Sequence, residues 1–263
     1  MTAPDDDVES RYTHGHQEPV LRSHRWRTAE NSAAYLLPHL EPTMSLLDVG
    51  CGPGTITADL AARVASVVGI DPSASVIDEA RAAFPDVDFR VADLFDVEGH
   101  WDVVHAHQVL QHLADPLAAM RRMAELGDLV AVRDGDYSGF TWAPGSDALD
   151  RWREIYLTVA RSNGGEPDAG RYLLALAHAA GLRDVTYSTS TWTFATPDDR
   201  AYWCGTWADR CLDSSFATRA VELGISTADE LTEIALGWRR WAELDDAVFI
   251  VLHGELLARP TLS

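Results

Sequence analysis

The chain has 263 residues, of which 46% are hydrophobic, which is enough for one large domain with a packed core. Its formal net charge of −20 argues against nucleic-acid binding through phosphate neutralisation and against binding to an anionic membrane surface. No apolar run approaches the roughly 20 residues of a membrane helix. The N-terminus is acidic, unlike a secretory signal, and the three cysteines lack the spacing of a disulfide framework or a metal site. We therefore expect a cytoplasmic protein that neither inserts into a membrane nor holds a metal ion.

Residues 1–26 are expected to form a tail and lid segment. An acidic tail is followed by a dense group of histidine, arginine and aromatic side chains that includes Tyr12 and Arg25. Two interpretations are open: a cap with a solvated basic edge, or a lid over a bound cofactor. In a lid, an arginine such as Arg25 would approach a carboxylate of the cofactor and Tyr12 would lie near its reacting end. The spacing of apolar residues predicts a helix over 27–40, which ends before Pro42.

A short apolar strand over residues 46–49 leads into a glycine loop and then into a helix. Gly50, Gly52 and Gly54 alternate through the loop, where glycine lets the backbone turn tightly and lets a ligand approach. Asp48 precedes the first glycine by two residues, which differs from the G-x-G-x-x-G pattern of dinucleotide sites. A carboxylate there would repel a pyrophosphate, but it suits a ligand with a cationic centre and an ammonium group.

Acids also follow the next two predicted strands. Asp71 ends a buried strand about 20 residues beyond the loop, where a carboxylate meets ribose hydroxyls in this layout, and Pro72 stops the strand. Asp93 and Leu94 follow the third strand. The alternative for Asp71 is a helix cap or a solvated loop acid, and the alternative for Asp93 is a turn-forming aspartate.

A fourth strand over residues 101–106 leads to His107 and His112, and a fifth covers 129–133. Strands and helices alternate strictly up to this point, which predicts a doubly wound parallel sheet with ligands at the carboxyl ends of its strands. The candidate residues that fall at such ends are Asp48, Gly50, Asp71, Asp93 and His107.

The loop from Asp48 to Gly54 resembles motif I of class I S-adenosylmethionine-dependent methyltransferases. The segment from His107 to Pro116 resembles the motif after the fourth strand of small-molecule methyltransferases of the ubiquinone/menaquinone-biosynthesis type (methyltransferase type 11-like). The resemblance implies an α/β fold with a mostly parallel, seven-stranded Rossmann-like sheet, a helical lid, and S-adenosylmethionine as cofactor with S-adenosylhomocysteine as product. It implies that Asp93 accepts from the adenine amino group, with Leu94 beside the ring. The cofactor-binding residues expected are Tyr12, Arg25, Asp48, Gly50, Gly52, Gly54, Asp71, Pro72, Asp93, Leu94 and His107.

We divide the chain into the 1–26 segment, a cofactor-binding core over 27–137, and a C-terminal half over 138–263 that completes the sheet. Two helical substrate-cap insertions are expected at about 138–169 and 197–244. The nine tryptophans lie mostly outside the sheet segments, which favours an aromatic pocket, although tryptophans on such helices belong to the core more often.

Methyl transfer from a sulfonium is an in-line displacement, in which alignment contributes roughly 7–11 kcal/mol of the barrier. His112 and His107 are the candidate bases, and an activated acceptor would need none. Weaker candidates are His14, His16, Asp136 and Tyr137. The sequence thus predicts a metal-independent enzyme that acts on a small apolar or aromatic metabolite, as a monomer or homodimer. The alternatives are a non-catalytic S-adenosylmethionine-binding protein and a nicotinamide-dependent oxidoreductase, although the chain has no lysine for a Tyr-x-x-x-Lys pair.

Overall fold

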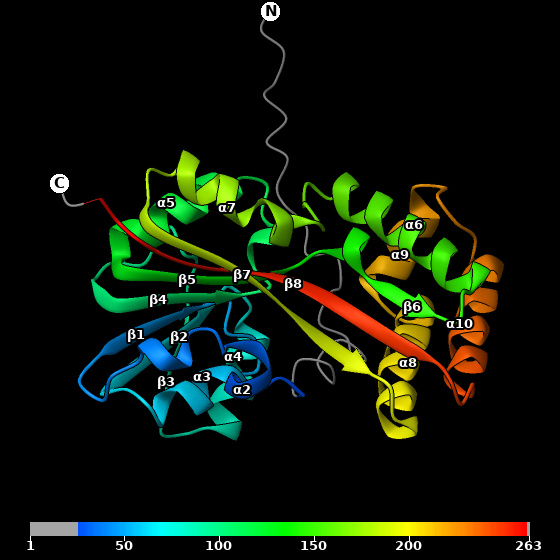
Figure 1. The fold of residues 1–263 in the computed structure, drawn as a ribbon, viewed down its shortest axis with the longest axis horizontal. Helices are drawn as coiled ribbons and strands as arrows, with labels where there is room; N and C mark the ends of the chain where they lie inside the picture. The colour runs from blue at the N-terminus through cyan, green and yellow to red at the C-terminus, as the bar shows by residue number, and fades with distance from the viewer. Residues whose placement is uncertain (1–25, 262–263) are drawn as a thin grey trace, which may run out of the picture.

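A computed structural model describes residues 26–261, which form two lobes joined by two long strands (Figure 1). One lobe is a sheet with helices on both faces, and the other is a helical cap beside the carboxyl ends of the first strands. Tyr12 and Arg25 lie outside the described residues. No helix in this part of the chain is long and apolar enough to cross a membrane.

The sheet contains eight strands in the order β3-β2-β1-β4-β5-β8-β6, and β7 pairs with β8. Their bounds are β1 (Ser45–Val49), β2 (Ser66–Asp71), β3 (Asp88–Val91), β4 (Trp101–His107), β5 (Gly127–Gly135), β6 (Thr141–Ala143), β7 (Arg183–Phe194) and β8 (Val248–Arg259). The first five strands are parallel, and β8 runs antiparallel to β5, β6 and β7. The expected doubly wound sheet is confirmed, and the three-residue β6 is the strand that the predicted set of seven lacks.

The helices follow the predicted alternation through the first half of the chain. They are α2 (Ala29–Ser32), α3 (Thr55–Ala61), α4 (Ala74–Ala83), α5 (Pro116–Leu126), α6 (Asp147–Ser162), α7 (Ala169–Ala179), α8 (Pro197–Leu212), α9 (Ser215–Glu222) and α10 (Ala228–Ala242), with 3₁₀ turns η1 (Leu37–His39), η2 (Leu110–His112) and η3 (Tyr137–Gly139). Asp115 accepts from the backbone N–H of Ala118 at 2.8 Å and Pro116 begins α5, a residue pair that is typical of a helix start.

Strand β8 belongs to both lobes. Its second half pairs with β5 from His253 to Ala258, and its first residues pair with β6 from Val248 to Ile250. Strand β7 follows the other edge of β8 along almost its whole length. The cap is therefore built on an extension of the sheet, and its position relative to the β1–β5 strands is fixed by main-chain hydrogen bonds.

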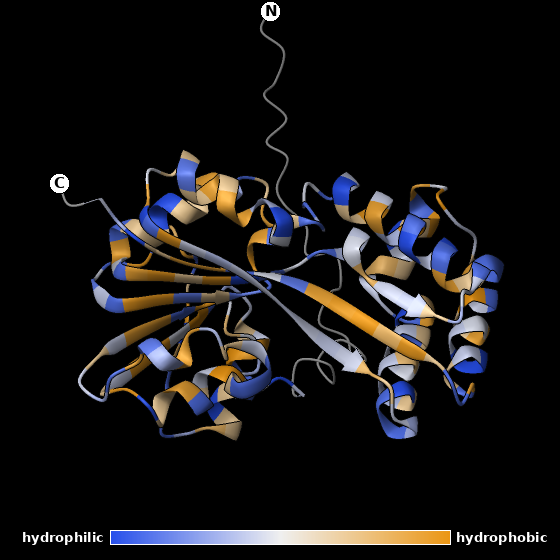
Figure 2. Cartoon of the chain, in the orientation of Figure 1, coloured by the Kyte–Doolittle hydropathy of each residue, from blue (hydrophilic) through white to orange (hydrophobic). Residues whose placement is uncertain are grey.

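Each lobe has its own apolar core. In the sheet lobe, α5 and α7 cover one face and α2 and α3 cover the other, so that the central strands are apolar on both sides (Figure 2). In the cap, α6, α8 and α10 enclose Trp152, Trp207 and Trp238, which are fully buried. Most of the tryptophans on the cap helices are thus core residues, as expected.

The helix predicted over 27–40 is wrong: α2 ends at Ser32 and a turn and η1 follow. The carbonyl oxygen of Asn31, which a continuing helix would use, accepts from the indole N–H of Trp192 at 2.6 Å. Pro38 has no N–H to continue a ladder. The hydrogen bond from Trp192 on β7 therefore takes the place of the local backbone hydrogen bond that the predicted helix would have made.

Candidate functional site

A cavity of about 690 Å³ lies at the carboxyl ends of β1 to β4 and reaches the cap. Every cofactor-binding residue predicted within the described range lines this cavity except Gly54. His107 and His112 line it as well. The structure thus brings together polar residues from four strands, as expected for the carboxyl edge of a parallel sheet.

The glycine loop is held to β2 by Asp71. Its carboxylate accepts from the N–H of Gly52 at 3.2 Å and from the N–H of Ser73 at 2.9 Å. Gly50 and Gly52 have φ values of 64° and 56°, in the left-handed region that favours glycine. This geometry presents backbone to the cavity in the way that a ligand-binding loop requires.

Gly54 is also left-handed, with φ of 83°, but it faces away from the cavity. A Cβ on Gly54 would lie 2.5 Å from the ring of Phe89. Here glycine permits close packing between the start of α3 and β3. Contact of Gly54 with the cofactor remains a prediction.

Asp48, at the end of β1, contacts α3 and β4 and so holds the start of the glycine loop. Its carboxylate accepts from the hydroxyl of Thr57 at 2.6 Å and lies 2.7 Å from Nδ1 of His105. Burial raises the pKa of the Cys51 thiol, and the negative charges of Asp48 and Asp71 raise it further. This negative potential at the loop favours a ligand with positive charge.

The β3 side of the cavity is formed by a tight turn. The Asp93 carboxylate accepts from the N–H of Phe95 at 2.9 Å, so this aspartate does shape the turn. Leu94 is buried and Phe95 is 52% exposed, although both line the cavity. Phe95 was not among the residues predicted from the sequence, although an aromatic residue directly after Asp93 and Leu94 was an available signal.

His107 and His112 are held in their neutral forms. Burial lowers the pKa of His107 well below its usual value, and the positive charges of Arg133 and Arg27 add to the effect. Burial, with Arg27 and Arg210 adding to it, lowers the pKa of His112 to about 3. Neither ring nitrogen of His107 has a hydrogen-bond partner among residues 26–261, which leaves both for a ligand.

The cap half of the cavity is aromatic and positively charged. Tyr137, Phe140, Trp192 and Trp203 line it. The guanidinium groups of two arginines do so as well, at Arg27 and Arg210. None of these except Tyr137 was selected from the sequence, because they come from segments up to 183 residues apart. The lining carboxylates lie elsewhere: Asp48 and Asp71 at the ends of β1 and β2, and Asp93 and Asp115 in the loops after β3 and η2.

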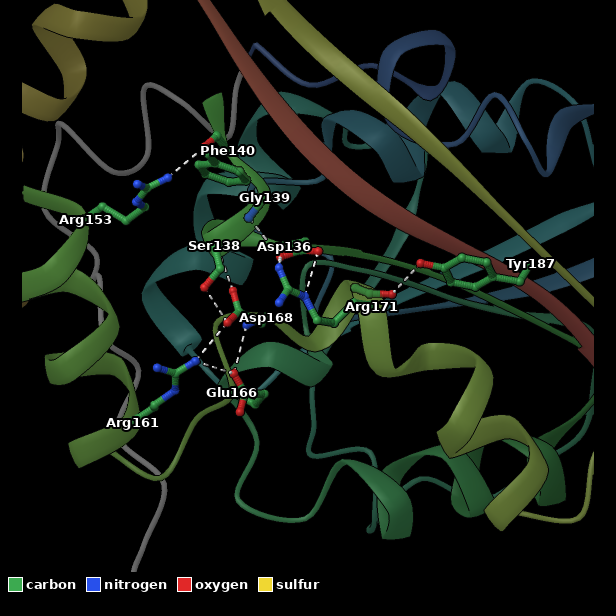
Figure 3. Close-up of polar contacts among 11 residues, drawn as sticks. Asp136, Ser138, Gly139, Phe140, Arg153, Arg161, Glu166, Asp168, Arg171 and Tyr187 are labelled. Atoms are coloured by element: carbon green, nitrogen blue, oxygen red, sulfur yellow. Dashed lines mark hydrogen bonds and ion pairs between the residues drawn. The ribbon is translucent and has the colours of Figure 1, made fainter. Parts of the chain in front are cut away.

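Turn η3 presents Tyr137 to the cavity and is held by the segment between α6 and α7 (Figure 3). The backbone N–H and the hydroxyl of Ser138 each donate at 2.7 Å to Asp168, which also accepts from Arg161 at 2.8 Å. The Tyr137 ring stacks on Phe140 at a centroid distance of 4.4 Å. These contacts fix the aromatic wall.

Asp136, one of the weaker candidates for a base, is bound elsewhere. Its carboxylate accepts from Nε of Arg171 at 2.9 Å and from the N–H of Gly139 at 3.1 Å (Figure 3). It is not among the residues that line the cavity. Within residues 26–261, no group of three or more His, Cys, Asp or Glu side chains is placed to hold a metal ion.

Comparison with known proteins identifies the family. Residues 21–187 match the family model described as a methyltransferase domain. A probable methyltransferase of Aspergillus luteorubrus is 30% identical over 94% of this chain and 96% of its own length. An uncharacterized methyltransferase of Schizosaccharomyces pombe is 29% identical over 98% of both chains. Among solved structures, the YcgJ protein of Bacillus subtilis shares the fold with a TM-score of 0.56 at 14% identity, over 89% of this chain and 100% of that one.

The fold and the site therefore define a class I methyltransferase. The chain belongs to the methyltransferase family, and its enzyme class is that of the S-adenosylmethionine-dependent methyltransferases. The predictions of family, fold class and enzyme class are confirmed. The non-catalytic and nicotinamide-dependent alternatives are not favoured.

Proposed function

We propose that this enzyme methylates a small aromatic or apolar acceptor, in line and without a metal ion. The observation that carries the proposal is the single cavity whose two halves differ in chemistry. One half, on the β1–β3 edge, is lined by glycines and carboxylates. The other half, under the cap, is lined by aromatic rings. Two ligands placed side by side in one cavity match the geometry of direct transfer.

The residues of the first half fit the cofactor. Gly50 and Gly52 let the methionine part approach the backbone, the Asp71 carboxylate has lone pairs for ribose hydroxyls, and Asp93 and Leu94 flank the place for adenine. When bound, S-adenosylmethionine supplies a methyl group on a sulfonium with a neutral leaving group. The negative potential around Cys51 supports binding of this cation.

The residues of the second half would position the acceptor and exclude water. Stacking between Tyr137 and Phe140 presents rigid ring surface, and Trp203 stacks on Phe194 at 4.5 Å. Neutral His107 and His112 accept a hydrogen bond from an acceptor hydroxyl more readily than they remove its proton, because their pKa values are low. Orientation is therefore the main contribution we assign to them.

Calorimetric titration with S-adenosylmethionine and, separately, with NADH tests the cofactor assignment. We expect the methyl donor alone to bind wild type, and binding to weaken at least about tenfold in Asp71→Ala, since a charged hydrogen-bond acceptor is lost. Asp86→Ala, an exposed acid beyond α4, is the matched control and should bind normally. Formation of S-adenosylhomocysteine across a panel of phenols and aryl acids then tests the acceptor class. Binding of NADH, or of neither ligand, would refute the proposal.

A further inference from the structure

Four side chains form a continuous hydrogen-bonded chain from the cavity wall into the sheet. A terminal nitrogen of Arg27 donates to Oε1 of Gln108 at 2.7 Å. Nε2 of Gln108 lies 2.8 Å from Nε2 of His253. Nδ1 of His253 lies 3.0 Å from a terminal nitrogen of Arg133. An arginine therefore occupies each end of this chain.

The hydrogens of this chain cannot all be matched with acceptors. Arginine only donates, the glutamine amide has one accepting end, and a neutral imidazole has one accepting nitrogen. Burial and the charge of Arg133 lower the pKa of His253 well below its usual value, so the ring is neutral. Whichever tautomer His253 adopts, and whichever way the Gln108 amide faces, one junction places two N–H groups opposite each other.

The interior end of the chain is fully buried, and the other end borders the cavity. Arg133 and His253 are 1% and 0% exposed. Arg133 is also held by Ser190 at 3.1 Å and by Glu255 at 3.2 Å. Arg27 and Gln108 are only half-buried and line the cavity. Of these four residues, Arg27 and Gln108 are the two that line the cavity, so a ligand acceptor would meet the chain between them.

We propose that a carboxylate of a cavity ligand binds between Arg27 and Gln108, and that Gln108 turns its amide to receive it. The carboxylate then accepts from both side chains, and Oε1 of Gln108 accepts from Nε2–H of His253. Arg133 donates to Nδ1 of the same ring, and every junction has one donor and one acceptor. The inference rests on the proposed function for its ligands, since the methyl donor and an acidic acceptor could each supply the carboxylate.

Gln108→Glu tests the proposal because it puts the missing acceptor into the protein itself. Gln108→Asn is the matched control: it keeps an amide, tolerates the left-handed φ of 55° at this position, and is too short to span the chain. The first readout is the melting temperature of the ligand-free protein. We expect Gln108→Glu to raise it and Gln108→Asn to lower it.

The second readout is the difference in affinity between a ligand that carries a carboxylate and an analogue that lacks it. In the donor arm, calorimetry compares S-adenosylhomocysteine with its decarboxylated analogue, which keeps the amine. In the acceptor arm, cinnamate is compared with cinnamamide on protein saturated with S-adenosylhomocysteine. In at least one arm, the ligand with the carboxylate should bind the wild-type protein about tenfold more tightly than the analogue without it. In Gln108→Glu, the two ligands of that arm should bind with equal affinity.

The arm that responds identifies the source of the carboxylate. The inference is overturned if neither arm responds to Gln108→Glu, or if this variant melts at or below wild type. Failure of the proposed function would look different, because wild type would then bind neither S-adenosylhomocysteine nor its decarboxylated analogue.

Discussion

The indole N–H of Trp192 donates a 2.6 Å hydrogen bond to the carbonyl oxygen of Asn31. This bond joins β7 to the segment that precedes β1, across 161 residues. Trp26 packs edge-on against the same indole at a centroid distance of 5.2 Å. Because Arg27 lies between these contacts and lines the cavity, Trp192 determines where the start of the described chain meets the site.

Trp192→Phe should loosen this segment while keeping an aromatic ring in the cavity wall. We expect the free energy of unfolding to fall by about 1 kcal/mol, the usual net contribution of one hydrogen bond. Affinity for S-adenosylhomocysteine should fall as well, since Arg27 loses its fixed position. Urea denaturation and calorimetry measure the two effects. Trp142→Phe, in which the ring stacked on Phe249 is retained, is the control; equal behaviour of the two variants would contradict the prediction.

Gly54→Ala should destabilise the fold. The new methyl group would lie 2.5 Å from the Phe89 ring, and the φ of 83° strains any residue with a Cβ. We expect a loss of about 1–3 kcal/mol in denaturant unfolding. Gly145→Ala, where a Cβ meets no atom within 4 Å, should change stability by far less. An unchanged unfolding free energy in Gly54→Ala would show that α3 and β3 do not pack as described.

His112 makes the protein less stable in acid. Its pKa is 6.5 in an ordinary environment and about 3 in the fold, so between these values the unfolded chain binds a proton that the native state does not. Stability from this group is therefore complete above pH 6.5 and is lost as the pH falls, by about 2 kcal/mol between pH 7 and pH 5. His112→Gln should remove this pH-dependent part of the free energy of unfolding. Urea titrations at both pH values measure this difference. Equal losses of unfolding free energy in wild type and in His112→Gln would contradict the prediction.

We expect the contribution of Asp134 to stability to have the opposite pH dependence, so that it is lost as the pH rises. Asp134 is buried below η2 and accepts from the N–H groups of Leu110 at 3.2 Å and Gln111 at 3.4 Å. Burial raises its pKa from 3.8 to about 8, so the native state holds a proton that the unfolded chain releases. Stability from this group is present below pH 3.8 and is lost as the pH rises towards 8, by about 2–3 kcal/mol between pH 5 and pH 7.

Asp134→Asn keeps an acceptor for the two N–H groups and has no proton to lose. We expect its unfolding free energy to increase relative to wild type as the pH rises from 5 to 7. Denaturant titrations at intermediate pH values locate the change. A constant difference between the two proteins would mean that Asp134 is already ionised in the fold.

The carboxyl edge of the sheet could be predicted because strict alternation of strands and helices leaves few topologies. Once β1 to β4 are parallel, their carboxyl ends meet, and Asp48, Asp71 and Asp93 follow from their positions in the sequence. The periodicity needed for this inference is local. The pair of Asp115 and Pro116 at the start of α5 is a local signal of the same kind.

The cap half of the cavity could not be predicted in the same way. Gln108 lies in a segment already chosen for its histidines, but its contact with His253 joins residues that are 145 positions apart. Arg210 lines the cavity because α8 follows β7, whose length takes the chain well beyond the β1–β5 strands. The break after α2 has a similar origin, since Trp192 uses the carbonyl group that periodicity assigned to a helix.

The continuity of β8 limits how this enzyme can admit its ligands. Many two-lobed enzymes open by rotation about a flexible connection, but here the β7–β8 ladder continues from one lobe into the other. A wide rotation would rupture main-chain hydrogen bonds in the middle of both strands. Small movements at the rim of the cavity, such as of exposed Phe95, would leave this ladder intact.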